Sequence, residues 1–288
     1  MRLGGKSIAT VFLCLIRMKR ACFLLLLVWI ITACDGNGAP ASTATLASPA
    51  APSIPPTVRP TDVREACVLG RDQVPSRVGA INTGYINSEP VDVKFALEGP
   101  WNFTQGPSSD LMERQVVALG TVKDATQFPG ADMAVRVTSS LFDAGGEEFE
   151  FYQSAGAIER EMGVSFSWSV QPTVYEPPYR TRMFPIKAGD SWKDTYRLKS
   201  SDGVTLVQAT YEALACGTLS VPAGMYGGTM LIRSTLHGLS DQGRPWSVFT
   251  YYWLSPGVGE SAWITSQVNE QQRLFRRASN FFRLKESK

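Results

Sequence analysis

The densest group of acidic side chains lies around residue 147 and comprises Asp143, Glu147, Glu148 and Glu150. Glu148 and Glu150 are two positions apart, so in a β-strand they share one face. Two carboxylates on one face could serve as the acid and base of a glycosidase or as ligands of a calcium ion. The simpler interpretation is a solvated face beside the Gly145-Gly146 turn, because charges next to turns are common. We therefore predict no catalytic residue in this group.

The single histidine, His237, is the next group whose chemistry has to be considered. Ser234, Ser240 and Asp241 lie near it, so a Ser-His-Asp triad is formally available. The sequence lacks the Gly-x-Ser-x-Gly turn that exposes such a nucleophile, and a metal site would need further His or Cys ligands at suitable spacing. Glycine loops that cradle phosphate are also missing. We predict a non-catalytic domain that uses neither a metal nor another cofactor.

The most aromatic segment, Trp246–Leu254, is apolar at alternate positions on both faces of a strand. One face carries Trp246, Val248, Tyr252 and Leu254, and the other carries Phe249, Tyr251 and Trp253. Such a strand is either buried twice, or it packs on one face and lines a cavity with the other. We predict that Phe249, Tyr251 and Trp253 line a ligand-binding groove for an acyl chain or a sugar. The simpler interpretation is a central strand covered on both faces by the rest of the fold.

The elements that must position these residues are β-strands. Val164, Phe166, Trp168 and Val170 alternate with serines, which is typical of a strand with one buried face. Pairs of Gly, Pro and Asp punctuate such segments, and Asp202-Gly203 predicts a hairpin between strands at 196–199 and 204–209. The pattern predicts a mainly β fold: a single antiparallel sandwich, barrel or strongly curved sheet.

Helical periodicity is scarce. We expect one or two short helices, around Thr61–Leu69 and Ser154–Glu161. The globular β-rich domain is predicted to span residues 63–288, which is long enough to bury a large core without cross-links.

The two cysteines of this domain, Cys67 and Cys216, predict a disulfide if the domain is exported, because oxidising compartments favour thiol pairing. The bond would connect the first segment of the domain to its middle. Two buried free thiols are the alternative.

The start of the chain carries the pattern of a secretory signal peptide. Met18-Lys19-Arg20 is followed by an apolar run over Ala21–Ile31, and small residues lead to Cys34. The sequence Ile31-Thr32-Ala33-Cys34 resembles the lipobox of bacterial lipoproteins. The resemblance implies that residues 1–33 are a signal peptide that is removed. Met18 is the expected true start, because only from Met18 do basic residues precede the apolar run in the order of a signal peptide. It also implies that Cys34 carries the fatty-acyl anchor, such as palmitate. An uncleaved anchor helix is the alternative, although the apolar run is short for a membrane span.

Residues 34–62 follow as a linker rich in Pro, Ala, Ser and Thr, a composition that cannot bury enough apolar surface to fold. Removing the predicted signal removes five basic residues and leaves 23 basic against 26 acidic side chains. The mature chain is therefore slightly acidic, and we expect no nucleic-acid partner.

Three patches also resemble a theme in bacterial secreted and envelope domains of unknown function. They are Ile186–Trp192, Leu219–Tyr226 and Tyr251–Gly259, with Gly-Asp-x-Trp, Val-Pro-Ala-Gly and Pro-Gly-Val-Gly at their centres. Glu260 departs from the theme, in which a basic residue follows. The glycines and prolines have a sufficient role as turn formers, so the theme implies architecture and no activity.

These observations predict a lipid-anchored protein of the cell envelope, outside the cytoplasm. Its β domain is expected to bind a ligand, with lipid as one candidate, or an envelope-protein partner, without catalysis. A structural component of the envelope and a carboxylate-based hydrolase are the alternatives.

Overall fold

The structure, a computed structural model, describes residues 67–142, 145–239 and 243–288. The predicted signal peptide, Cys34 and the linker lie outside these residues, as do Asp143, Ser240 and Asp241. The regular structure of the described residues consists of β-strands and three short 3-10 helices. No helix in this part of the chain is long and apolar enough to cross a membrane.

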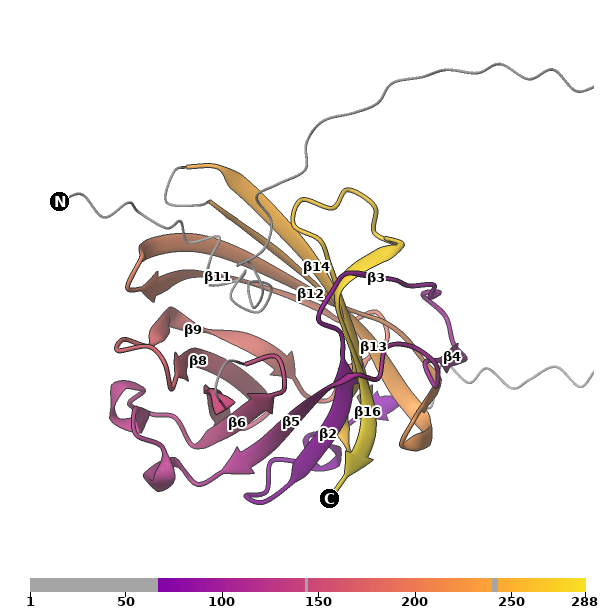
Figure 1. Ribbon diagram of the computed structural model, residues 1–288, viewed down its shortest axis with the longest axis horizontal. Helices are drawn as coiled ribbons and strands as arrows, with labels where there is room; N and C mark the ends of the chain where they lie inside the picture. Colours follow the sequence, from indigo (N-terminus) through magenta and orange to yellow (C-terminus); the bar gives the residue numbers. More distant parts are fainter. Residues whose placement is uncertain (1–66, 143–144, 240–242) are drawn as a thin grey trace, which may run out of the picture. The chain divides into compact units, whose positions relative to one another are not determined.

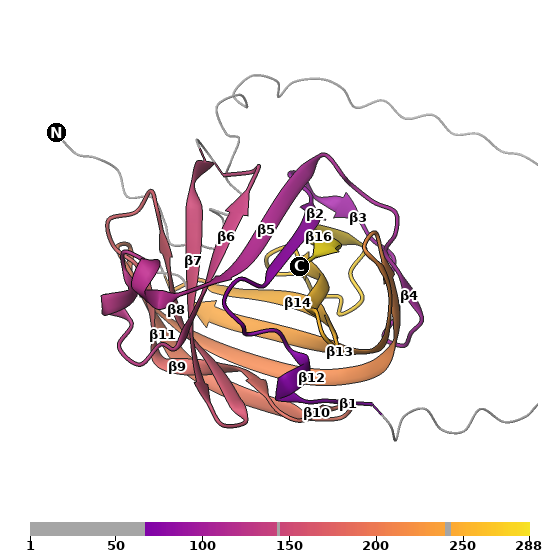
Figure 2. The same cartoon turned by 90° about the horizontal axis from the view of Figure 1, so that it is seen from below.

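Twelve antiparallel strands close into one barrel (Figure 1 and Figure 2). Their order around the barrel follows the chain, and pairing of the last strand with the first completes the ring. In that order they are β2 (Ile81–Ile86), β5 (Asp110–Val117), β6 (Met133–Ser139), β7 (Glu147–Ala155), β8 (Ile158–Phe166), β9 (Thr173–Met183), β11 (Ser191–Ser200), β12 (Gly203–Val221), β13 (Gly224–Leu239), β14 (Pro245–Ser255), β15 (Gly259–Ser266) and β16 (Arg277–Ser287). Of the three predicted architectures, the barrel is confirmed.

The ring is closed where the first barrel strand, β2, meets the last, β16. The Ile81 amide donates to the Lys288 carbonyl at 2.9 Å, and the Lys288 amide donates back at 2.8 Å. Gly84 of β2 faces the ring of Phe282 so closely that a Cβ there would lie 2.2 Å from the nearest ring atom. Closure at this seam therefore depends on glycine at position 84.

Short connections join most neighbouring strands. The predicted hairpin at Asp202-Gly203 is confirmed: it joins β11 to β12, and Ser200 pairs with Gly203 across it. The strand predicted from Val164 onward ends earlier than its alternation suggested, because β8 stops at Phe166 and Val170 is exposed.

The expectation of a helix over Ser154–Glu161 is wrong. This segment is the hairpin between β7 and β8, in which Ala155 pairs with Ile158 across a two-residue turn. Gly156 in that turn has φ +59, a left-handed conformation that favours glycine and ends any regular run. The other expected helix falls mostly outside the described residues, and its last two positions form the short strand β1 (Val68–Leu69).

The segment between β2 and β5 covers the outside of the barrel. Its strands β3 (Val91–Asp92) and β4 (Trp101–Asn102) pair with β16 and β12, and both views place them on the same side of the barrel (Figure 1 and Figure 2). Phe95 and Phe103 from this segment pack on the aromatic side chains of β14. A second covering segment contains two 3-10 helices, η3 (Leu119–Thr121) and η4 (Ala125–Gln127), and ends in Phe128, which stacks on Phe151 at 3.9 Å.

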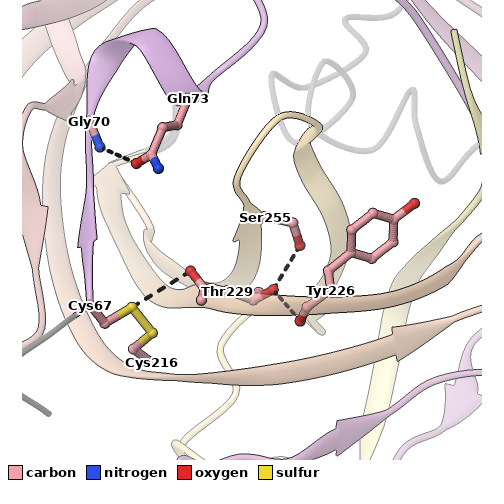
Figure 3. The surroundings of a disulfide bond; sticks show 8 residues. Cys67, Gly70, Gln73, Cys216, Tyr226, Thr229 and Ser255 are labelled. Carbon is pink, nitrogen blue, oxygen red and sulfur yellow. Dashed lines mark hydrogen bonds between the residues drawn. A yellow bond between two sulfur atoms is a disulfide. The ribbon is translucent and has the colours of Figure 1, made fainter. Parts of the chain in front are cut away.

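The first described residues are connected to the barrel by the Cys67–Cys216 disulfide, which was predicted from sequence (Figure 3). Cys216 lies on β12, and the two Cα atoms are 6.2 Å apart. Beyond Cys67, β1 pairs with β10 (Ile186–Lys187), and η2 (Arg71–Gln73) follows. Beside the disulfide, the hydroxyls of Thr229 and Ser255 share a buried hydrogen bond of 2.8 Å (Figure 3).

Candidate functional site

The barrel encloses a cavity of about 280 Å³. Every one of the twelve barrel strands contributes at least one lining residue, so the cavity lies in the interior of the ring. Side chains along a barrel strand point alternately inward and outward, so every second residue of a strand lines the cavity. On β14, for example, the inward residues are Val248, Thr250, Tyr252 and Leu254.

Aromatic side chains form much of the cavity wall. They are Tyr152, Phe166, Tyr175, Tyr179, Tyr211, Tyr252 and Trp263. Several are held by stacking on rings outside the lining: Tyr179 stacks on Tyr196 at 4.4 Å, and Tyr211 stacks on Trp192 at 5.3 Å. The wall is therefore supported by packed rings, which restrict its side chains to one arrangement.

A network of buried ion pairs crosses the same interior. Arg114 of β5 donates two hydrogen bonds to Glu150 of β7, at 2.8 and 2.7 Å, and lies 3.7 Å from Glu260 of β15. Arg182 of β9 binds the other oxygen of Glu260. Burial opposes the charge on Arg114, but Glu150 and Glu260 outweigh it and raise its pKa well above the ordinary value. Both arginines that line the cavity are thus fully matched by carboxylates.

Glu159 extends this network away from the cavity. Its carboxylate is 1% exposed and binds both Arg182 and Arg71, the latter from η2. Burial would raise the pKa of Glu159, yet the two guanidinium groups lower it below the ordinary value. Arg71 also donates to the Ser154 hydroxyl at 2.7 Å. Ion pairs therefore connect η2, in the segment that follows the disulfide, to the charged residues of the barrel interior.

Two further carboxyl groups line the cavity with no cation bound to them. Glu148 is 8% exposed, and its carboxyl forms no hydrogen bond or ion pair in the described part of the chain. Glu161 of β8 accepts one hydrogen bond, from the Tyr179 hydroxyl at 2.5 Å. Burial, reinforced by the negative charge of Glu150, raises the pKa of each to about 8. At pH 7 both groups therefore carry a proton and are neutral.

The structure corrects the expected environment of the acidic group around residue 147. Glu148 and Glu150 face the barrel interior, whereas a solvated face was the preferred interpretation. Glu147, of opposite parity, is the partly exposed member and lies 3.5 Å from Arg136. The reason is the register of β7 against β6 and β8, which turns the even-numbered residues inward.

The cavity also lies on the other face of β14 from the one expected. Tyr251 and Trp253 are fully buried outside the barrel wall, against Phe95, Trp101 and Phe103 of the covering segment. Phe249 shares their face and packs against the same core. The aromatic residues proposed from sequence as groove residues thus belong to a closed core, and the opposite face lines the cavity.

The formally possible triad residues are not brought together. Ser234 lines the cavity, whereas His237 lies three positions along β13 with opposite parity and is exposed. Ser240 and Asp241 lie outside the described residues. In the described part of the chain, no group of three or more His, Cys, Asp or Glu is arranged to hold a metal ion.

Sequence reasoning missed four charged cavity residues: Arg114, Glu161, Arg182 and Glu260. One signal could have found Arg114, because it occupies the inward parity of β5 between Met112 and Val116. Glu161 and Arg182 lie beside irregularities in the β8–β9 pairing, where the simple alternation of inward and outward residues fails.

Comparison with known proteins adds little to this geometry. No protein-family model matches the sequence, and none of the curated proteins matches it. Among solved structures, a protein of Parabacteroides distasonis described as a candidate lipoprotein is similar, with 11% sequence identity and a TM-score of 0.40. The match covers 77% of this chain and 99% of that one. A similarity of this degree does not carry an assignment of function.

Proposed function

We propose that this is a lipid-anchored protein of the cell envelope whose barrel binds a small molecule in its interior cavity, without catalysis. The observation that carries the proposal is the unpartnered, nine-tenths buried carboxyl of Glu148 facing a cavity of about 280 Å³. Buried polar groups are normally hydrogen-bonded, and one left open toward a cavity is best explained by a ligand or solvent that completes it.

The lining argues for a compact, partly polar ligand. The cavity volume lies just below the range for small-molecule pockets, roughly 300–1,000 Å³. Four glutamates and two arginines face this space. An acyl chain would leave the Glu148 carboxyl without a partner and would place apolar atoms against the other charged groups, which is costly. A lipid tail, which was the first candidate from sequence, is therefore a poorer fit than a small polar molecule with an apolar part.

A hydrolase is the second candidate, because Glu148 and Glu161, whose pKa is raised to about 8, lie beside a third carboxyl group, Glu150, and carboxyl groups in different environments can serve as acid and base. Ligand binding is favoured because Glu150 is not free to act as a base. Both of its oxygens accept hydrogen bonds from Arg114, and one also accepts from the Tyr152 hydroxyl at 2.7 Å. Hydrolysis of a panel of p-nitrophenyl glycosides that was lost in Glu148→Gln would reverse this preference.

Native mass spectrometry of the protein extracted from membranes of its own host tests ligand binding. We expect a species heavier than the acylated chain, which returns to the acylated mass on denaturation. The variant Thr250→Phe places a ring in the cavity and should lose this species, while Thr235→Phe on the same strand pair but outside the lining should keep it. A bound species of the same extra mass in the wild type and in Thr250→Phe would contradict the proposal.

The anchor is tested separately at Cys34. Metabolic labelling with palmitate should mark the wild type, and Cys34→Ser should remain unlabelled and move from the membrane to the soluble fraction. One acyl chain alone gives only marginal attachment, so loss of all chains should release the domain completely. A Cys34→Ser variant that still fractionates with membranes would disprove lipid anchoring without affecting the ligand proposal.

A further inference from the structure

The cavity contains more carboxyl groups than cations. Glu148, Glu150, Glu161 and Glu260 line it, against Arg114 and Arg182. Each arginine is already bound by glutamate: Arg114 by Glu150 and Glu260, and Arg182 by Glu260 and Glu159. The two carboxyl groups left over, Glu148 and Glu161, have no protein cation bound to them in the described part of the chain.

The position of Glu148 is the strongest sign of a missing partner. It lies two residues from Glu150 on the same face of β7, but only Glu150 is reached by Arg114. An unpaired carboxyl at this depth is costly unless something completes it. It lines the cavity rather than a packed core, so a ligand can reach it.

The rest of the wall suits a positive charge with attached apolar groups. Tyr175, Tyr179, Tyr211 and Tyr252 line the same cavity, and the faces of aromatic rings attract cations. β7 and β14 lie six places apart in the ring of twelve strands, so Glu148 and Tyr252 occupy opposite walls. A group between them would meet a carboxylate on one side and an aromatic ring on the other.

We propose that the barrel binds a small organic cation, with its amine, guanidinium or quaternary ammonium group between Glu148, Glu161 and the tyrosine wall. This inference rests on the proposed ligand-binding function and specifies the class of ligand. In the empty cavity the two arginines are neutralised by protein carboxylates, and the charge of the ligand is balanced when Glu148 or Glu161 gives up its proton.

A consequence of this arrangement is that binding releases protons. Because burial and Glu150 raise the pKa of Glu148 and Glu161 to about 8, both are protonated in the empty protein at pH 7. An incoming cation favours their ionised forms, so affinity should rise with pH up to about 8. The other titratable and charged groups facing this space are Arg114, Glu150, Tyr152, Tyr175, Tyr179, Arg182, Tyr211, Tyr252 and Glu260.

Isothermal titration calorimetry of the full mature protein with choline and agmatine tests the proposal. The matched neutral probe is 3,3-dimethylbutan-1-ol, which has the shape of choline without its charge. We expect one of the two cations to bind about tenfold more tightly than the neutral probe, since loss of a buried charge partner is costly. Titrations at pH 7 in two buffers of different ionisation enthalpy should reveal proton release, which requires no variant.

The variants Glu148→Gln and Glu161→Gln should each weaken binding of that cation about tenfold. Both remove a carboxyl whose charge is disfavoured by burial, so they should fold, which thermal unfolding checks. Glu147→Gln is the matched control, because it makes the same change one residue away on the outer face of β7 and should leave affinity unchanged.

Five results would overturn the inference. Equal affinity for choline and its neutral isostere, or cation binding unaffected by both variants, would exclude a role for the two carboxyl groups while keeping a ligand cavity. Binding of Ca²⁺ that displaces the organic cation would assign the carboxyl groups to a metal. If no probe binds and no species co-purifies with the protein, the ligand-binding function itself fails; if a neutral or anionic species co-purifies, only the cation class fails.

Discussion

Glu148 and Glu150 lie two residues apart on one face of β7, yet Arg114 binds only Glu150. The same strand therefore presents one carboxyl group that is hydrogen-bonded to a guanidinium and one that burial keeps protonated. Register alone would favour Glu148, because Arg114 pairs with Val137 of β6 and Val137 pairs with Glu148 of β7. The guanidinium instead extends to Glu150, which also accepts a hydrogen bond from the Tyr152 hydroxyl. One strand face thus holds a structural charge and a group available to a ligand.

Stability should fall as the pH rises from about 5 to about 8. Glu148 and Glu161 have an ordinary pKa of 4.5 and a pKa of about 8 in the folded protein, so over this range the folded state holds protons that the unfolded state releases. The free energy of unfolding therefore decreases with pH and levels off above 8. Urea unfolding between pH 5 and 9 measures it, in the absence of ligand.

The double variant Glu148→Gln/Glu161→Gln should remove this decrease and be more stable than the wild type at pH 8 by roughly 1–3 kcal/mol. Glu147→Gln should keep the wild-type dependence. A wild type whose stability rises over pH 5–8 would show that neither carboxyl is protonated in the folded protein.

Glu159→Gln should destabilise the barrel by about 3 kcal/mol, because it leaves the partly buried Arg71 without its carboxylate and Arg182 with only Glu260. The effect should be largest near neutral pH and shrink in acid, since the lowered pKa of Glu159 means that its contribution is lost as the pH falls. Glu176→Gln breaks an exposed ion pair with Lys199 and should leave the urea midpoint unchanged. Equal midpoints for both variants would mean that the Glu159 network is energetically neutral.

Substitutions at two adjacent residues of β14 should have different effects, one mainly on stability and the other mainly on ligand binding. Trp253→Ala removes a ring packed on Trp101 and Phe103 and should lower the free energy of unfolding by about 3–5 kcal/mol. The folded fraction should bind the organic cation as the wild type does. Tyr252→Leu removes a cavity ring and should weaken that binding several-fold with a smaller loss of stability. The reverse outcome would restore the outer face of β14 as the ligand site.

Reduction of the Cys67–Cys216 disulfide should lower the free energy of unfolding by up to about 5 kcal/mol, since the bond spans 149 residues. Thermal unfolding with and without dithiothreitol measures the loss. The double variant Cys67→Ser/Cys216→Ser should start at the lower stability and show no response to the reductant. A wild type that is indifferent to dithiothreitol would indicate that the bond contributes little.

The sequence was sufficient for features governed by neighbouring residues. Alternation predicted the strands, and Asp202-Gly203 predicted the hairpin between β11 and β12, because a tight turn depends on local backbone preferences. The same local evidence failed at Ser154–Glu161, where the turn at Gly156 interrupts the segment.

Closure of the barrel and the identity of its inner face could not be predicted, because both depend on pairing between distant strands. β2 meets β16 across nearly the whole domain, and only that contact distinguishes a barrel from an open sheet. The strand β14 is apolar on both faces, so its pattern did not show which face the segment carrying Phe95 and Phe103 would cover. The sequence also drew attention to Glu148 but led us to expect it on a solvated face, because the pairing of β7 with β6 and β8 that turns it inward is not visible in the local sequence.

The disulfide also determines how the domain responds to a pulling force. Strain transmitted through the chain ahead of Cys67 passes through the sulfur–sulfur bond into β12, so the thirteen residues between Cys67 and Ile81 are bypassed. The seam between β2 and β16 is then spared from being peeled open one hydrogen bond at a time. Under reducing conditions the pulling force would instead act on the pairing of β2 with β16, and the barrel would open from its first strand.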